Sequence, residues 1–219
     1  MNIFDIIGPV MIGPSSSHTA GAVRLGRVAN KLMEDLEPEE LEITLSGSFA
    51  CTYQGHGTDR ALLAGIMGYD TDSEEIRNAL EIAQKRGIRY TFLKEDLPDS
   101  HPNTARICYR LRDGRVGMIQ GASIGGGNIC VELVDGMRVD FSGENHTILI
   151  LHRDRPGIIA SVTSLIRDRY LNICCFHLTR EEKGGRAIMT IELDSISEEV
   201  EKDLRKLDDV INAIVIRAI

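Results

Sequence analysis

The residues best suited to chemistry begin near the N-terminus, in a polar run made of Ser15, Ser16, Ser17, His18 and Thr19. The run stands immediately before a helical pattern that extends from about His18 to Glu34. Free N–H groups and the helix dipole at such a terminus attract a carboxylate. A plain Ser/Thr cap is the alternative, but one capping residue would suffice for it. The four hydroxyl side chains beside a histidine therefore favour a functional loop.

A second candidate follows a strand-like segment and precedes a helix-like one, and it consists of His56, Gly57, Thr58 and Asp59. Gly55 and Gly57 flank the histidine, so the backbone can bend tightly and leave the imidazole uncrowded. A histidine held in this way could transfer protons or orient a substrate oxygen. A surface loop that happens to carry a histidine is the alternative, and the segment alone does not separate the two interpretations.

Two further motifs are harder to assign, and they occupy His101 to Asn103 and Gly121 to Asn128. The second is rich in glycine, but it lacks the Lys-Ser/Thr ending of a P-loop and does not sit at the strand-to-helix step of a dinucleotide-binding unit. Nucleotide binding is therefore not expected. Its glycines are expected to form a sharp turn between strands, or to let a ligand or partner backbone approach closely.

The last candidate segment, in the C-terminal third, is suited to binding a small effector. At the junction of a strand and a helix it contains Asp154, Arg155, Pro156, Gly157 and Ile158. An amino acid could place its carboxylate on the helix N-terminus, with Gly157 allowing close contact. Asn172, which opens the next strand near the same edge, is the side chain best suited to an α-amino group. Ordinary helix-start chemistry is the alternative.

The elements around this last segment follow the order βαββαβ, which is that of a ferredoxin-like unit. They are predicted from a strand at 146–152, a helix that begins at Pro156, strands at 172–180 and 186–194, a short helix after Glu198 and a strand at 210–216. Such a sheet leaves an unpaired edge, and open edges favour strand addition. We therefore expect a homodimer that joins two of these sheets edge to edge.

The region before this unit is predicted to be mixed α/β, with a largely antiparallel sheet. Helices are expected near 58–67 and 73–86, and strands at 41–45, 88–94, 104–111, 116–120, 129–134 and 137–141. A short polar join at Ser142 to Asn145 places a domain boundary near 144. The predicted fold class is α+β, with a mixed domain at 1–144 and the ferredoxin-like domain at 145–219.

Composition excludes several classes of partner. The net charge is −8 and no Lys/Arg-dense run occurs, so nucleic acid is not expected as a partner. No apolar run approaches the roughly 18 residues of a membrane span. The segment Met1 to Asp5 lacks the cationic flank of a signal peptide. We therefore expect a cytoplasmic protein without a membrane segment.

The five cysteines are odd in number and show none of the paired spacings typical of zinc or iron–sulfur sites. Most are predicted to be reduced thiols in the core. Cys174 and Cys175 lie in an apolar run, where neighbouring side chains point to opposite faces, so core packing is favoured over metal binding. We expect no metal ligands in this chain.

The motifs together resemble one family over nearly the whole chain. The segments Ile12 to Thr19, Gly55 to Asp59 and Ser123 to Gly127, in this order, look like the β portion of bacterial iron–sulfur-dependent L-serine dehydratases. The C-terminal segment resembles ACT domains, in which Asp154 to Gly157 corresponds to the acidic-x-Pro-Gly ligand loop. The predicted domains are accordingly a dehydratase β-type domain and an ACT regulatory domain.

This resemblance implies an L-serine ammonia-lyase that converts serine to pyruvate and ammonia through an aminoacrylate. It also implies a separate α subunit that carries a [4Fe-4S] cluster. The polar segments Ser15 to Thr19 and His56 to Asp59 would then close the site, hydrogen-bond the substrate and exclude water. L-serine is the first candidate for the ACT effector as well.

Two alternatives stay open at this point. Histidines and hydroxyl residues do not by themselves exclude a pyridoxal-phosphate dehydratase, which would use a lysine Schiff base. The other alternative is a non-enzymatic amino-acid-sensing regulatory protein, because the N-terminal domain also resembles the allosteric substrate-binding domain of some phosphoglycerate dehydrogenases. Under that alternative, Ser15 to Asp59 would be needed only for the response to an effector.

Overall fold

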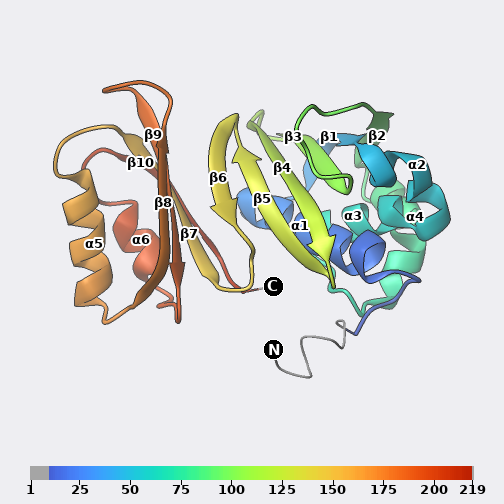
Figure 1. The fold of residues 1–219 in the computed structure, drawn as a ribbon, viewed down its shortest axis with the longest axis horizontal. Coiled ribbons are helices and arrows are strands. Elements are labelled where there is room, and N and C mark those ends of the chain that lie inside the picture. The colour runs from blue at the N-terminus through green and yellow to red at the C-terminus, as the bar shows by residue number, and fades with distance from the viewer. Residues whose placement is uncertain (1–9, 219) are drawn as a thin grey trace. The chain divides into compact units, whose positions relative to one another are not determined.

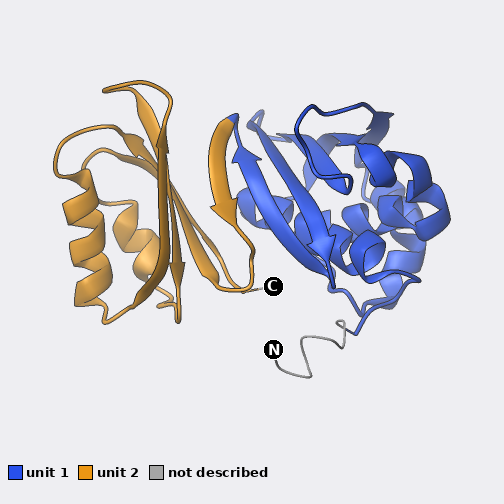
Figure 2. Cartoon of the chain, viewed as in Figure 1, with its two compact units in different colours: residues 1–136 blue, residues 137–219 orange. Residues whose placement is uncertain are grey.

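The computed structural model describes residues 10–218 of the chain. The chain divides into two compact units, residues 1–136 and 137–219 (Figure 2). The segment Met1 to Asp5, on which the argument against a signal peptide rests, lies outside the described part. Within residues 10–218, no helix combines the length and the apolar character that crossing a membrane requires.

The first sheet has six strands in the order β2-β1-β3-β4-β5-β6. β1 pairs in parallel with β2, whereas β1–β3, β3–β4 and β4–β5 are antiparallel, so the prediction of a mixed, largely antiparallel sheet is confirmed. In chain order the elements are the π-helical turn η2 (Ser16–Ala20), α1 (Gly21–Leu32), β1 (Pro38–Leu45), α2 (Gly47–His56), α3 (Thr58–Ile66), the 3-10 helix η3 (Glu74–Asn78), α4 (Ala79–Lys85), β2 (Arg89–Lys94), β3 (Thr104–Leu111), β4 (Val116–Gly125), β5 (Asn128–Val134) and β6 (Met137–Phe141).

The helix α2 is not predicted by the sequence pattern. It contains Gly47 and Gly55, has no amphipathic repeat, and buries only Phe49. His56 is the last residue of this helix, so its interpretation as a loop residue is wrong. Gly57 follows in the left-handed conformation, with φ 72°, and joins the end of α2 to the start of α3. An L side chain rarely adopts this conformation, which explains the glycine.

α1 and α3 cross with their backbones in contact. A Cβ atom on Gly65 would lie 2.0 Å from the carbonyl oxygen of Val23, and one on Gly26 would lie 2.4 Å from that of Leu62. Neither position therefore has room for a side chain. This tight crossing fixes α1, which follows the polar turn η2, against α3, which follows His56.

The second unit contains the predicted βαββαβ order, and the ferredoxin-like prediction is confirmed. Its antiparallel sheet has the order β10-β7-β9-β8, and both helices cover the same face of that sheet (Figure 1). The elements are β7 (His146–Arg153), α5 (Ile158–Asp168), β8 (Ile173–Arg180), β9 (Arg186–Leu193), α6 (Val200–Leu204) and β10 (Val210–Ile216). A core that includes Ile148, Val162 and Ile191 joins the sheet to these helices.

The cysteines are not core residues, contrary to the prediction. Cys51, Cys174 and Cys175 are exposed, Cys108 and Cys130 are half-buried, and all five are free thiols. Cys174 and Cys175 lie on β8, an edge strand of the second sheet. The apolar run suggested a strand covered on both faces, but β8 is exposed over most of its length.

Candidate functional site

His18 is held by hydroxyl groups on both ring nitrogens. Its Nδ1 lies 3.4 Å from Ser15 Oγ and its Nε2 lies 3.2 Å from Ser48 Oγ. The backbone N–H of His18 also donates to Ser15 Oγ at 3.3 Å, so Ser15 caps the turn η2. The capping interpretation and the functional one therefore both apply to this run, because one serine caps the turn and also contacts the imidazole.

The structure brings the first two sequence motifs together. The ring centroids of His18 and His56 lie 4.6 Å apart at an interplanar angle of 83°, and the ring of Phe49 lies 5.3 Å from that of His18. The two histidines come from separate elements, η2 and the end of α2. A pair of imidazoles in edge-to-face contact, with hydroxyls around one of them, can hold and transfer a proton.

A cavity of about 240 Å³ adjoins this pair. Its walls come from the loop before η2, the end of α2, the start of α3 and η3, and are formed by Ile12, Gly13, Pro14, Thr19, Gly55, His56, Gly57, Arg60, Ile76 and Arg77. Thr19 is 1% exposed, and neither its Oγ1 nor His56 Nδ1 has a hydrogen-bond partner within the described residues. Buried polar atoms without partners cost free energy, so a ligand that satisfies them would be stabilised here.

The remaining predicted residues of the two motifs surround the pair. Thr58 is fully buried, with an unpartnered Oγ1, at the start of α3. Asp59 is 7% exposed and its Oδ1 accepts the N–H of Arg60 at 2.8 Å. Burial raises the pKa of the Asp59 carboxyl above its ordinary value. Ser16 and Ser17 are half-buried, and their hydroxyls form no hydrogen bond to any residue in the range 10–218.

Ser48 and Phe49, which both contact His18, were missed by the sequence analysis because α2 was not predicted. The motif His101 to Asn103 positions them. The N–H of Phe49 donates to the carbonyl of Pro102 at 3.3 Å, and the N–H of Ser46 donates to that of Thr104 at 3.1 Å. His101 to Asn103 therefore tethers the start of α2. The sequence Ser46 to Phe49 does not by itself indicate a helix or a site.

The glycine-rich motif Gly121 to Asn128 contains a turn between strands, as predicted. Gly125 pairs with Asn128 across the end of β4 and β5, and Gly126 and Gly127 between them have φ of 64° and 87°. Such angles favour glycine in a two-residue hairpin turn. Arg24 on α1 donates from Nη1 to the carbonyl of Gly127 at 2.8 Å, which fixes the turn against the helix.

In the second unit, the predicted effector loop is compact. Asp154 Oδ2 accepts the N–H of Gly184 at 3.0 Å and lies 3.3 Å from Arg180 Nη1. The bond from Gly184, followed by the nearby Arg180, lowers the pKa of this half-buried carboxyl. Gly157 has φ 96° and precedes α5, which begins at Ile158 rather than at the predicted Pro156. Ile158 itself is 6% exposed and belongs to the core.

Asn172 does not join this loop within one chain. It precedes Ile173, which pairs with Leu193, whereas Arg153 pairs with Arg186 at the other end of β9. Asn172 therefore lies at the opposite end of the sheet from Asp154, and the expectation that both share one edge is wrong. Its Nδ2 donates to Asp194 Oδ2 at 2.7 Å. Helix α5 carries the chain back along the sheet from the end of β7, so β8 begins at the end of the sheet where β7 begins.

Beside the effector loop lies His152, which is fully buried at the end of β7. Its Nδ1 lies 2.9 Å from the carbonyl oxygen of Arg153 and must donate to it, because a carbonyl only accepts. Its Nε2 is buried without a partner among the described residues. His152 is the last residue of the strand predicted at 146–152, directly before the candidate segment.

Comparison with known proteins decides the family. A model described as serine dehydratase beta chain matches residues 2–133, and a model described as AHAS small subunit-like ACT domain matches residues 148–212. The probable L-serine dehydratase beta chain of Bacillus subtilis (strain 168) is 44% identical over 211 residues, covering 96% of this chain and 95% of that protein. The L-serine dehydratase beta chain of Peptoniphilus asaccharolyticus is 37% identical over 192 residues, covering 87% and 86%.

The chain belongs to the serine dehydratase beta chain family. Its second unit is an ACT domain. A D-3-phosphoglycerate dehydrogenase of Bacillus subtilis (strain 168) is 27% identical over 201 residues, which cover 89% of this chain but only 37% of that enzyme. This beta chain therefore matches these two beta chains over most of their length, and the dehydrogenase over 37% of its length.

The described part of this beta chain offers no site for a metal or an iron–sulfur cluster. Within residues 10–218, no group of three or more His, Cys, Asp or Glu side chains is arranged to hold a metal ion. The five cysteines are spread over both units. The described residues therefore do not fit a [4Fe-4S] cluster.

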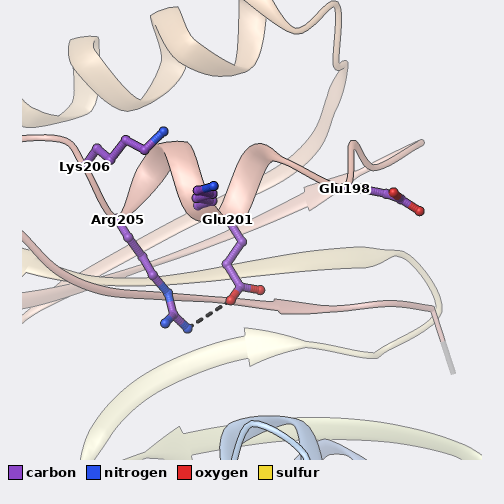
Figure 3. A pocket seen from close by; sticks show the side chains of 5 residues that line it. Glu198, Glu201, Arg205 and Lys206 are labelled. Atoms are coloured by element: carbon purple, nitrogen blue, oxygen red, sulfur yellow. Dashed lines mark ion pairs between the residues drawn. The ribbon is translucent and has the colours of Figure 1, made fainter.

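A groove on the ACT domain is a surface feature with mixed charge. It runs along α6 and is lined by Glu198, Glu201, Lys202, Arg205 and Lys206 (Figure 3). Arg205 Nη2 and Glu201 Oε1 form an ion pair at 2.9 Å across one turn of α6 (Figure 3). Both side chains are partly exposed, so water screens the pair. The groove selects for no particular charge.

The environment of His18 predicts a pH dependence. Burial, and then the proximity of His56, lower the pKa of His18 below its ordinary value of 6.5. The folded chain therefore binds fewer protons than the unfolded chain just below pH 6.5, so its stability falls as the pH falls through the window between 6.5 and the lowered pKa. Following the His18 ring by NMR should show a midpoint below 6.5 that rises towards 6.5 in His56→Gln. A midpoint at or above 6.5 in the unaltered chain would contradict this.

Proposed function

We propose that this beta chain works with a separate α subunit as an L-serine dehydratase that releases pyruvate and ammonia. The observation that carries the proposal is the pairing of His18 with His56 beside a cavity whose lining residues Thr19 and His56 each have an unpartnered polar atom. Two L-serine dehydratase beta chains support it, because their similarity to this chain extends over 96% and 87% of its length. We assign the dehydratase part to residues 1–144 and the ACT part to residues 145–219, which the matches at 2–133 and 148–212 support.

The division of labour follows from the chemistry of serine. Its hydroxide is a poor leaving group and its Cα–H is a weak acid, so a Lewis acid that stabilises the departing oxygen and a proton acceptor both favour elimination. A [4Fe-4S] cluster on the α subunit would supply the Lewis acid. This beta chain would bind and orient the substrate, exclude water and hold a proton, with Ser15, Ser48 and His56 positioning the His18 imidazole.

Anaerobic co-purification tests this assignment. A tagged beta chain expressed together with the α subunit should retain that subunit, and the eluted complex should show the broad visible absorption of an iron–sulfur protein. The tagged ACT domain alone serves as a control for adhesion to the resin. If the beta chain is recovered without the α subunit even when both chains are present above their concentrations in the cell, the result would argue for the regulatory-protein alternative.

We further propose that two ACT domains pair through their β8 strands and bind L-serine at the interface. β8 is an edge of the sheet and carries Phe176, which is 36% exposed. Antiparallel pairing of β8 with its copy would place Asn172 of one chain beside Arg180 of the other. Arg180 contacts Asp154, so the two parts of the effector site that lie apart in one chain would meet across two.

A serine titration of segment 145–219 tests this proposal, since the segment encloses its own core. We expect a dimer that binds L-serine, and a roughly tenfold weaker affinity in Asn172→Ala, which is the usual cost of losing a hydrogen bond to a charged group. Asn212→Ala, on β10, is the matched control. Light scattering gives the mass and calorimetry gives the affinity. A monomer that binds no amino acid would rule out the proposal. A ligand bound at the interface would change activity only if it binds one arrangement of the domains more tightly than another.

A further inference from the structure

The cavity beside His56 is lined by groups that donate hydrogen bonds or carry positive charge. Thr19 and His56 contribute a hydroxyl and a ring nitrogen, and Arg60 and Arg77 contribute guanidinium groups. The other lining residues are Ile12, Gly13, Pro14, Gly55, Gly57 and Ile76, so no carboxylate from residues 10–218 lines the cavity. A space with this lining is complementary to an anion.

Two further observations support an anionic ligand. The side chain of Thr19 is almost completely buried, yet its Oγ1 has no partner among the described residues, and His56 Nδ1 is in the same situation. The two guanidinium groups come from separate elements, Arg60 from α3 and Arg77 from η3, and both line the cavity. A hydroxyl can donate or accept a hydrogen bond, so the two arginines set the sign of the charge that the cavity favours.

The two arginines differ in their present contacts. Arg60 forms no ion pair within residues 10–218, although it follows Asp59 directly. Arg77 Nη1 pairs with Glu74 Oε2 at 3.0 Å, and both of these side chains are about two-thirds exposed, at 65% and 68%. Such an exposed pair contributes little to stability, so Arg77 can exchange Glu74 for a ligand at low cost.

We propose that this cavity binds the carboxylate of the amino-acid substrate, with Arg60 and Arg77 as its cationic anchors and Thr19 as a buried donor. The inference rests on the proposed dehydratase function and adds the two arginines to the substrate-binding residues. The carboxylate bound here would place the rest of a small amino acid towards the His18–His56 pair, which adjoins the cavity. Arg60 and Arg77 are positioning residues in this account, because they hold the substrate and do not exchange protons with it.

The test uses the complex of this beta chain with its α subunit and two probes that separate the charges of serine. 3-Hydroxypropanoate is serine without its amine, and ethanolamine is serine without its carboxylate. In the double variant Arg60→Gln/Arg77→Gln, the KM for L-serine and the inhibition constant of 3-hydroxypropanoate should both rise about tenfold. The inhibition constant of ethanolamine and kcat should change less than about twofold. Thr19→Val, which keeps the shape of the side chain, should show the same pattern.

The control is Arg89→Gln on β2, which removes an equally exposed arginine that pairs with Glu39 away from the cavity. Thermal unfolding of each variant separates misfolding from loss of binding. Unchanged KM values in the double variant and in Thr19→Val would overturn the inference, and so would an equal weakening of ethanolamine. If the unaltered complex does not turn over serine at all, the proposed function fails instead, so the two failures are distinguishable.

Discussion

Replacing His18 by alanine should lower kcat of the assembled dehydratase by a factor of about 100 or more while leaving the beta chain folded. His18 is the only side chain in the described site that contacts two hydroxyls and a second imidazole together. Its lowered pKa keeps it neutral at pH 7, so it can accept a proton. Removing it would leave Ser15 and Ser48 without their shared partner but would open no large void in the core.

The control for this variant is His146→Ala, because His146 starts β7 in the other unit, and β7 is not the edge strand of the proposed dimer. It should keep full activity and an unchanged melting temperature. His56→Ala should behave like His18→Ala, since the two rings are in contact. A large loss of thermal stability with normal specific activity in either variant would show that the pair is a packing feature and not part of the site.

The order of helices and strands in the ACT domain could be predicted because its elements carry strong local signals. Alternating apolar strands, the helix start at Gly157 and the glycine turn at Gly184 each agree with the βαββαβ order. The position of Asn172 could not be predicted as easily, since it depends on which end of the sheet each strand begins from. Side-chain exposure on β8 was also missed, because strand order decides which apolar strand becomes an edge.

In the first unit, the motif residues could be chosen from the sequence but their contacts could not. His18 and His56 stood out by residue type and by their neighbouring glycines and hydroxyls. Their 4.6 Å approach depends on α2, a helix held by tertiary contacts such as the bond from Phe49 to Pro102 and not by its own propensity. Ser48 was missed for the same reason. Arg60 and Arg77 gave no signal, because single arginines on helices are ordinarily solvated.

A second large effect on activity is expected when the α subunit is absent. Purified alone, it should form no pyruvate from L-serine above background, because its described residues offer hydrogen-bonding and cationic groups but no ligand set for a Lewis acid. Without such an acid, the departure of hydroxide from serine is strongly disfavoured at neutral pH. Addition of the cluster-bearing α subunit under anaerobic conditions should restore turnover. Exposure of the complex to oxygen should abolish it, while the fold of this chain stays intact.

The most direct test of the account is therefore the rate of pyruvate formation when a fixed amount of α subunit is titrated anaerobically with this beta chain. The account predicts a rate that rises from near zero, saturates at a fixed ratio of the two chains, and stays near zero when the titrant is the His18→Ala variant. Robust turnover by the metal-free beta chain alone would contradict it, and so would an α subunit whose rate does not depend on the beta chain.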